Sequence, residues 1–206
     1  MKNDKETKEK LLVSAKAEFL EKGYMQASLR NICKNAGVTT GALYFFFKDK
    51  EDVFASLVEE PLLGLHKMMK EHYWDEMQLA ERGGIQLHDM TDDLAAAKAI
   101  IHYMYQHYDA FRLLLRKSQG SRFENVIDEF VTITEKHYRI LTDAFSKQTG
   151  SEPIEDYMLH WISHMCIDAF VHMLTHEVSE EEALQCMERI VQYMIAGWMG
   201  MFQIKK

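Results

Sequence analysis

Proline is nearly absent from this chain, and no other feature constrains its fold as strongly. Only two prolines occur in 206 residues, and apolar residues recur at spacings of three and four along almost the whole sequence. Proline breaks helices, and a spacing of three to four places apolar side chains on one helix face. The alternation of Val, Ile and Thr that is typical of strands is sparse. The sequence therefore predicts an all-α protein of about nine helices.

Glycines, prolines and capping residues give the expected helix boundaries. We expect helices over about 6–22, 29–36, 40–47, 50–78, 91–107, 109–117, 121–148, 153–177 and 179–203. Gly23 ends the first of these, at a position where a left-handed residue commonly closes a helix. Pro61 lies inside the fourth helix and is expected to kink it or to break it into two, because proline has no N–H to donate.

Residues 28–47 read as two short helices joined by a turn that contains glycine. Ser28 stands at an N-cap position before the first helix, Gly37 makes the turn, and Thr39 caps the second helix. The residues expected to face inward are Leu29, Ile32, Val38, Leu43 and Phe47. This is the helix-turn-helix pattern, which places its second helix in the major groove of DNA.

The charge of the chain is divided unevenly along its length. The formal net charge is −8, but residues 1–50 contain ten basic and six acidic side chains. The remaining residues contain 14 basic and 26 acidic ones. DNA phosphates are attracted to the first segment and repelled by the second. This distribution indicates a small DNA-binding domain joined to a larger acidic body.

Several classes of protein are disfavoured by what the sequence lacks. No apolar run approaches the roughly 18 residues that cross a bilayer, and the first residues do not lead into an apolar signal segment. The three cysteines form neither a disulfide framework nor a Cys-x-x-Cys site. Nucleophile, phosphate-loop and metalloprotease motifs are missing. We therefore expect a cytoplasmic protein that is not an enzyme, needs no cofactor and does not bind membranes.

The segment 36–53, Ala-Gly-Val-Thr-Thr-Gly-Ala-Leu-Tyr-Phe-Phe-Phe-Lys-Asp-Lys-Glu-Asp-Val, resembles the DNA-binding motif of the tetracycline-repressor (TetR) family. Glycines, a capping hydroxyl, a tyrosine and a lysine match the family pattern at fixed offsets, and the resemblance covers about residues 6–58. It implies a DNA-binding domain over 1–50 and a helical domain over 51–206 that binds a ligand and dimerises. It also implies a homodimeric repressor that leaves a palindromic DNA operator when a small-molecule effector binds.

The resemblance implies which side chains contact DNA. Tyr44 resembles the family tyrosine whose hydroxyl binds a phosphate, and Phe45 occupies a variable position that often touches bases. Gly41 is expected to let the reading helix approach the DNA backbone closely. The full set of expected contacts is Ser28, Thr39, Thr40, Gly41, Tyr44, Phe45, Lys48 and Lys50.

Two positions depart from the family pattern. Phe46 stands where the family most often has a histidine that contributes a phosphate contact, and Thr40 replaces a frequent Lys or Arg. Phenylalanine has no group that binds a phosphate. We therefore expect a modest affinity for each DNA half-site, which makes dimerisation more important.

The last two expected helices carry apolar residues on more than one side. A helix with two apolar stripes buries both, one within its own subunit and one against a partner. We expect a dimer interface that contains Met165, Ala169, Met187, Val191, Met194, Trp198 and Met201. A central core helix is the alternative explanation of the same pattern.

Aromatic residues and 14 methionines suggest an apolar or aromatic effector. The residues expected to line its pocket are His102, Phe111, Phe123, Phe130, Trp161, His164 and Met165. A different function is a regulator or buffer that binds a metal or haem through His160, His164, His172 and His176, which step by four with Asp168 along one helix. Ordinary interface and pocket histidines are the simpler interpretation of that series.

Overall fold

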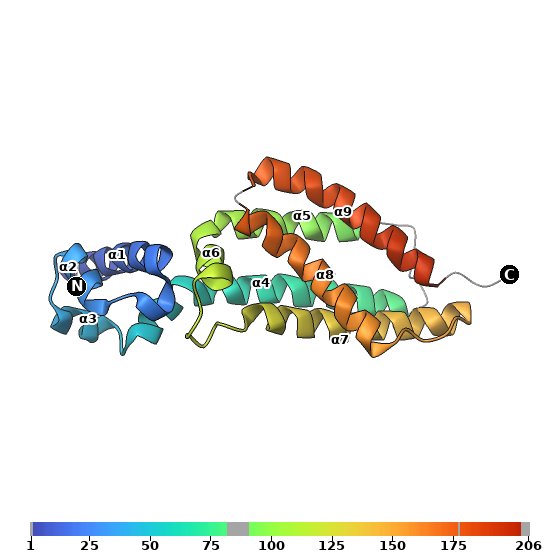
Figure 1. Ribbon diagram of the computed structural model, residues 1–206, viewed down its shortest axis with the longest axis horizontal. Coiled ribbons are helices and arrows are strands. Elements are labelled where there is room, and N and C mark those ends of the chain that lie inside the picture. The colour runs from blue at the N-terminus through green and yellow to red at the C-terminus, as the bar shows by residue number, and fades with distance from the viewer. Residues whose placement is uncertain (1, 82–90, 177, 203–206) are drawn as a thin grey trace. The chain divides into compact units, whose positions relative to one another are not determined.

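The computed structural model describes residues 2–81, 91–176 and 178–202, and this part of the chain contains helices but no strands. Figure 1 shows the helices, which are α1 (Lys2–Gln26), α2 (Leu29–Ala36), α3 (Thr40–Phe46), α4 (Lys50–Glu81), α5 (Thr91–Gln106), α6 (Tyr108–Arg116), α7 (Val126–Thr149), α8 (Asp156–Thr175) and α9 (Glu180–Met201). The predicted fold class is confirmed. In the described segments, we find no helix both long and apolar enough to cross a bilayer.

The chain divides into two compact units. Unit 1 comprises Met1–Gly64 and His107–Val126, and unit 2 comprises Leu65–Gln106 and Ile127–Lys206. Sequence reasoning places a single boundary near residue 50, and the structure differs because α6 packs on α1. The ammonium of Lys16 lies 2.8 Å from the carboxylate of Asp109 on α6. The backbone N–H of Tyr24 donates to the carbonyl of Lys117 over 2.8 Å.

Unit 1 has an apolar core shared by α1, α2, α6 and the first part of α4. Leu11, Ala15 and Phe19 follow one another at spacings of four on α1, and all three are fully buried. The rings of Phe19 and Phe54 meet edge to face, with centroids 5.0 Å apart. Burying a side chain of this size contributes roughly 1.5–3 kcal/mol to folding. Other fully buried members of unit 1 are Ile32, Val53 and Phe111.

The α1 helix is interrupted at Gly23, as its glycine predicts. The backbone there has φ 76° and ψ 166°, and a further turn follows before the chain leaves for α2. A positive φ favours glycine, because it has no Cβ to clash with its own carbonyl. The interruption redirects the chain from α1 toward the helix-turn-helix.

Pro61 does not break α4. The helix runs as one element from Lys50 to Glu81 with Pro61 inside it, so of the two expected outcomes, a kink or a break, the break is wrong. Proline in a helix interior costs about 3 kcal/mol because one backbone hydrogen bond is lost. Val58, Leu62 and Leu65 on the flanking turns are buried, and the packing of these side chains offsets that cost.

Unit 2 is a helical bundle in which α5, α8 and α9 share a core. Its buried members are Ala97, Ile101, Met173, Ala183, Met187 and Val191. The hydroxyl of Tyr105 on α5 donates to the carbonyl of Val178, between α8 and α9, over 2.5 Å. A smaller apolar cluster joins α7 to the end of α9 through Leu141, Phe145 and Phe202.

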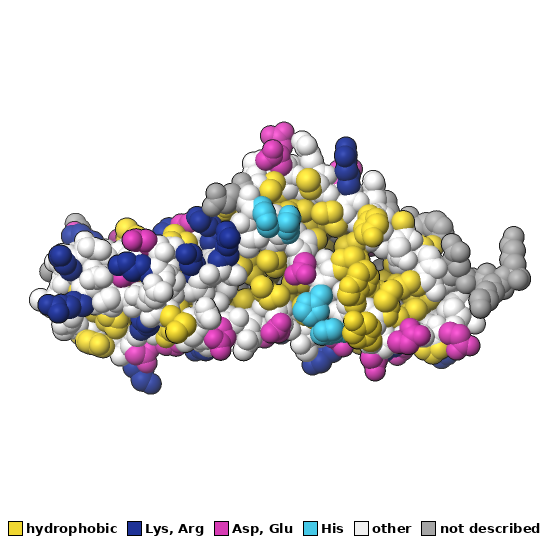
Figure 2. Space-filling view, viewed as in Figure 1, with side chains coloured by type: hydrophobic (Ala, Val, Ile, Leu, Met, Phe, Trp, Pro, Cys, Tyr) yellow, Lys and Arg dark blue, Asp and Glu magenta, His cyan; other side chains and the backbone are white. Residues whose placement is uncertain are grey.

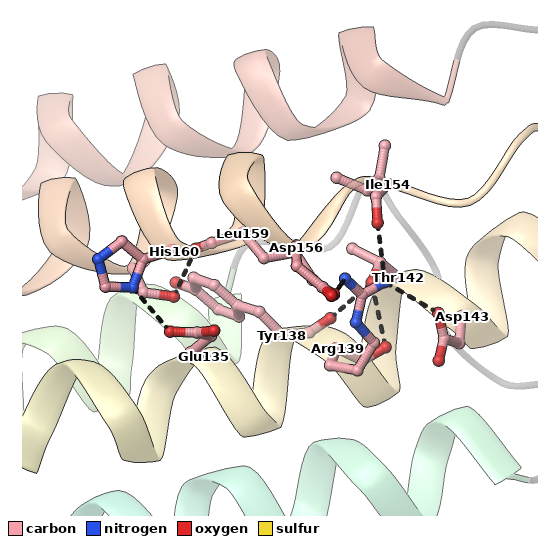
Figure 3. A network of polar contacts seen from close by, with 10 residues as sticks. Glu135, Tyr138, Arg139, Thr142, Asp143, Ile154, Asp156, Leu159 and His160 are labelled. Atoms are coloured by element: carbon pink, nitrogen blue, oxygen red, sulfur yellow. Dashed lines mark hydrogen bonds and ion pairs between the residues drawn. The ribbon is translucent and has the colours of Figure 1, made fainter.

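Polar contacts connect α7 to α8 (Figure 3). The guanidinium of Arg139 donates to the carbonyl of Ile154 over 2.8 Å, and it also forms an ion pair with Asp156 in the first turn of α8. Farther along, Nδ1 of His160 lies 2.9 Å from a carboxylate oxygen of Glu135. These contacts hold the start of α8 against α7.

Candidate nucleic-acid interface

A buried carboxylate lies at the junction of α1 and α2. Glu18 is only 4% exposed, and its Oε1 accepts hydrogen bonds from the Ser28 N–H over 3.1 Å and from the Asn31 amide over 3.4 Å. Lys22 donates to the same oxygen over 3.1 Å. Burial raises the pKa of Glu18, but the hydrogen bonds to its charged form outweigh burial and hold the pKa below the usual value. An ionised Glu18 therefore anchors the start of α2.

The two ends of α2 follow from local sequence. Ser28 has an extended backbone, and its Oγ accepts a hydrogen bond from the Asn31 N–H over 3.5 Å. Gly37 is left-handed, with φ 69° and ψ 31°, and its N–H donates to the carbonyl of Lys34. The next N–H, of Val38, donates to the carbonyl of Cys33 over 3.0 Å. This is a Schellman ending, and it turns the chain sharply into α3.

Thr39 begins α3 in the way that Ser28 begins α2. Its Oγ1 accepts a hydrogen bond from the Ala42 N–H over 3.2 Å. A hydroxyl has one hydrogen to donate as well as lone pairs that accept. Capping uses only a lone pair, so each cap retains an O–H that can donate to a phosphate. Helix capping and phosphate binding therefore do not compete at Ser28 and Thr39. Thr40, the next residue along the chain, is exposed and so is also accessible to a phosphate.

Gly41 lies in the first turn of α3 and is exposed. A Cβ placed there would meet only the Oγ1 of Thr39, at 3.8 Å, which is an ordinary van der Waals contact. Packing within the described part of the chain therefore does not require a glycine at this position. The missing side chain leaves the first turn of α3 open to close approach from outside.

Two aromatic side chains project from α3. Tyr44 is 58% exposed and Phe45 is 75% exposed. Phe46 is half-buried, with its ring centroid 4.9 Å from that of Phe45 and 6.4 Å from that of Phe47. Tyr44 therefore projects to the surface rather than into the core. Large exposed aromatic rings on one short helix indicate a surface that contacts a partner.

The two lysines at the start of α4 differ in their surroundings. The ammonium of Lys50 donates to the carbonyls of Met25 and Ala27 over 3.1 and 3.3 Å, and it lies 4.7 Å from the ring centroid of Tyr24. Lys50 therefore ties α4 to the α1–α2 junction. Lys48 is exposed. Figure 2 shows further Lys and Arg side chains over the surface formed by α1, α2 and α3.

Residues 11–57 match the sequence model of the bacterial regulatory proteins of the tetR family. Over 53 residues the chain is 49% identical to the HTH-type transcriptional repressor BepR of Brucella suis, an alignment that covers 26% of this chain and 25% of BepR. The transposon Tn10 TetC protein of Escherichia coli is 37% identical over 176 residues, which are 81% of this chain and 82% of TetC. The chain belongs to the TetR family.

Family membership confirms the resemblance seen in the segment 36–53. The chain spans only 25% to 37% of the length of the first curated relatives that it matches. Structural similarity to solved proteins extends over more of the chain than these sequence alignments do. A solved gamma-butyrolactone receptor, described as ArpA-like, superposes with a TM-score of 0.58 at 19% identity, over 92% of this chain and 87% of the receptor. At this identity the likeness concerns the fold alone.

The residues expected at a TetR dimer surface fall into two groups. Met165, Ala169, Met194, Trp198 and Met201 are half-exposed. Met187 and Val191 are instead buried in the core that α9 shares with α5 and α8, which leaves them no surface to offer a partner. The α8–α9 pair also exposes large aromatic residues outside the expected interface set, among them Tyr157 and Tyr193. Figure 2 shows hydrophobic and histidine side chains gathered over α8 and α9.

The residues expected to line an effector pocket are divided between the two units. Phe111 and Phe123 are buried in unit 1, because α6 and the loop after it pack on α1 and α4. Trp161 is 50% exposed on α8. His164 and Met165 are half-exposed on the same helix.

Only one residue of that set is buried inside unit 2. Phe130 on α7 lies beside His66 on α4, with ring centroids 4.9 Å apart. His102 is exposed on α5, and its Nδ1 lies 2.6 Å from a carboxylate oxygen of Glu180. Within unit 2, Phe130 is therefore the buried member of the expected set, and His102 lies at the surface.

The histidines of α8 form two separate pairs. The rings of His160 and His164 lie 4.6 Å apart, and those of His172 and His176 lie 3.8 Å apart and are stacked. Glu135 contacts His160, but among the described residues neither pair forms, with a third His, Cys, Asp or Glu, a set of ligand atoms that all lie within 4.8 Å of one another. The geometry of the series therefore does not favour the metal or haem function suggested by its spacing.

A polar link through Glu51 is not evident from the sequence. The hydroxyl of Tyr24 donates to Oε2 of Glu51 over 2.8 Å, and the backbone N–H of Arg122 donates to Oε1 over 3.2 Å. Burial, together with the Glu51 carboxylate, raises the pKa of Tyr24 to about 12. Glu51 thus connects α1, α4 and the loop after α6. These residues are far apart in sequence, so no local pattern identifies them.

Proposed function

We propose that this TetR-family protein is a sequence-specific DNA-binding transcriptional repressor that leaves its operator when a small molecule binds. The observation that carries the proposal is the outer face of α3, where Gly41 leaves the backbone open and Tyr44 and Phe45 project beside it. BepR is named a transcriptional repressor, which supports repression rather than activation. Because its partner is the chromosome, the protein acts in the cytoplasm.

The chemistry of this face suits the major groove. The groove is about 12 Å wide and admits a helix. Phosphates flanking it accept hydrogen bonds from the hydroxyls of Ser28, Thr39 and Tyr44, while the exposed Lys48 adds positive charge. The ring of Phe45 is placed to contact base edges, and an apolar side chain there favours the methyl group of thymine. Recognition through Phe45 therefore relies more on apolar contact and DNA shape than on bidentate hydrogen bonds.

Dimerisation supplies the affinity that one half-site lacks. The α8–α9 pair exposes Trp161, Tyr157 and Tyr193, and large exposed aromatic side chains of this kind mark an interaction site. A second copy of the same face covers it in a two-fold dimer. The two α3 helices then read major grooves that lie about 34–36 Å apart, or a multiple of that distance, which requires a palindromic operator.

The effector is an apolar or aromatic molecule that binds in unit 2. Met69, Met104 and Phe130 are buried there, and methionine and aromatic side chains adapt readily to apolar ligands. A coupling of about 1–3 kcal/mol between effector and DNA is enough to release the operator. Catalysis is not part of this function.

Selection from a library of random DNA duplexes tests the proposal. The full-length protein is expected to enrich one palindromic motif, and Phe45→Ala is expected to relax the preference at the base pairs that the ring touches. Trp74→Ala, which removes an exposed aromatic from α4 in unit 2, serves as the control and should enrich the wild-type motif. A folded protein that enriches no motif would rule the proposal out.

A further inference from the structure

Three metal-ligating groups converge where α4 meets α5. His72 and Glu76 stand one turn apart on α4, and Asp93 lies in the first turn of α5. Nε2 of His72 lies 3.7 Å from Oε2 of Glu76 and 3.6 Å from Oδ1 of Asp93. One ligand atom from each residue can be chosen so that all three lie within 4.8 Å of one another. Each side chain is half-buried, so the groups are enclosed yet reachable from solvent.

We propose that His72, Glu76 and Asp93 bind a divalent transition-metal ion. Nitrogen and oxygen ligands lie about 2.0–2.2 Å from zinc, so tetrahedral ligand atoms are separated by about 3.4 Å. The distances from His72 to the two carboxylates are close to that separation. One imidazole and two carboxylates suit ions such as Zn²⁺ and Mn²⁺. Three protein ligands leave a coordination position open to water or to a small molecule.

A buried histidine orients one of the proposed ligands. Nε2 of His137 on α7 lies 2.5 Å from Oε2 of Glu76, and the His137 side chain is 2% exposed. Its ring stacks on Tyr73 with centroids 3.9 Å apart, and the Tyr73 hydroxyl lies 2.9 Å from the hydroxyl oxygen of Thr134. Metal-binding carboxylates are commonly held by such outer partners. The site is therefore supported from three helices, α4, α5 and α7.

The local charge favours a cation at this place. Burial lowers the pKa of His72, but the carboxylates of Asp93 and Glu76, which favour the charged imidazolium, outweigh burial and raise the pKa above its usual value. Asp75 adds a further negative charge nearby. Two cations can answer this charge, a proton on His72 or a metal ion bound to all three groups. If a metal ion binds to all three groups, the metal affinity of the protein depends on Asp93 and Glu76. If a proton on His72 is the only cation, it does not.

Cobalt titration of the full-length protein without a histidine tag separates these possibilities. Co²⁺ serves as the probe because its visible absorption reports coordination by protein ligands. We expect one Co²⁺ per chain, an affinity at least 10-fold weaker in His72→Gln and Asp93→Asn, and an affinity about 10–100-fold weaker in His137→Phe. Circular dichroism of each variant, recorded without metal, confirms that it is folded.

The histidine pairs on α8 provide the matched control. A variant with His160, His164, His172 and His176 all changed to Gln should keep the wild-type Co²⁺ affinity. The proposal is overturned if this variant loses the metal. It is also overturned if Asp93→Asn binds Co²⁺ as tightly as the wild type, because His72 and the two carboxylates would then form an ion pair and no metal site. None of these readouts depends on DNA, so the outcome is distinct from that of the proposed repressor function.

Discussion

The carboxylate of Glu18 on α1 accepts a hydrogen bond from the backbone N–H of Ser28 at the start of the helix-turn-helix, over 3.1 Å. Ser28 in turn caps α2 through its hydroxyl. The first helix of the motif is therefore held from behind by a buried charge that lies ten residues earlier in the chain. The orientation of α3 depends on this anchor, because the Gly37 turn joins α2 directly to α3.

Replacing Glu18 by Gln should weaken the fold. The amide presents one acceptor oxygen instead of two and brings an N–H₂ group toward Lys22. We expect the free energy of unfolding to fall by about 1.5–3 kcal/mol, the range for hydrogen bonds to charged groups. Urea denaturation followed by circular dichroism measures the change. Glu21→Gln, at an exposed position of the same helix, should change stability little. Equal losses in the two variants would contradict the anchoring role.

The same carboxylate predicts a pH dependence. The folded-state pKa of Glu18 lies below its ordinary value of 4.5. Its contribution to stability is therefore fully present above pH 4.5 and is lost as the pH falls through the folded-state value. We expect the stability of the wild type to decline more steeply with acidification than that of Glu18→Gln. Parallel pH profiles of the two proteins would show that Glu18 is not the responsible group.

Two glycines of the motif should respond in opposite ways to alanine. Gly41→Ala leaves the fold intact, and the higher helix propensity of alanine is expected to add up to about 1 kcal/mol of stability. The added methyl group nevertheless obstructs close approach, so DNA affinity should drop by at least 10-fold. Gly37→Ala instead destabilises the protein by about 1–2 kcal/mol, because the position is left-handed. Unimpaired DNA binding by a stable Gly41→Ala protein would argue against close approach at α3.

Phe46 offers a gain-of-function test. Phe46→His restores the residue that the TetR motif usually carries at this half-buried position. The imidazole supplies a phosphate contact, and its protonated form also releases counterions from DNA. We expect tighter binding, by roughly 2–10-fold, and a larger gain at pH 6 than at pH 8. Fluorescence anisotropy at the two pH values measures both effects, and a variant that binds no better at either pH would refute the predicted contact.

The α8–α9 face should control assembly. Trp161→Glu places a charge on an exposed aromatic position of α8, and burying that charge in an interface is strongly unfavourable. Light scattering coupled to size-exclusion chromatography should then show monomers at concentrations where the wild type is dimeric. Trp74→Glu, a matched change at an exposed tryptophan of α4, should remain dimeric. A dimeric Trp161→Glu protein would locate the interface elsewhere.

Local chemistry explains why the DNA-binding motif is predictable from sequence. Ser28 and Thr39 cap helices through their own side chains, and Gly37 adopts a conformation that few other residues tolerate. Each of these features depends on neighbours within a few residues. The caps, the turn and the exposed residues of α3 therefore follow from a short stretch of sequence.

Features that depend on tertiary packing were not predictable in this way. Pro61 stays inside a continuous helix because buried neighbours on both sides offset the lost hydrogen bond. Phe123 belongs to unit 1 because its ring packs beside Phe54, with centroids 6.0 Å apart. His72 and Asp93 meet only once α4 and α5 have packed together. The spacing of four along α8 suggests a metal site that the geometry does not favour, since spacing shows a shared helix face but not what lies opposite it.

Binding to DNA from the region upstream of the protein's own gene tests the central claim most directly. Anisotropy of this labelled duplex, and of a scrambled duplex of equal composition, is measured at two salt concentrations. The account predicts at least about 10³-fold tighter binding to the native sequence at physiological salt, together with loss of this preference in Gly41→Ala. Equal affinity for the two duplexes by a folded dimer, or an unchanged preference in Gly41→Ala, would contradict the claim that α3 reads DNA.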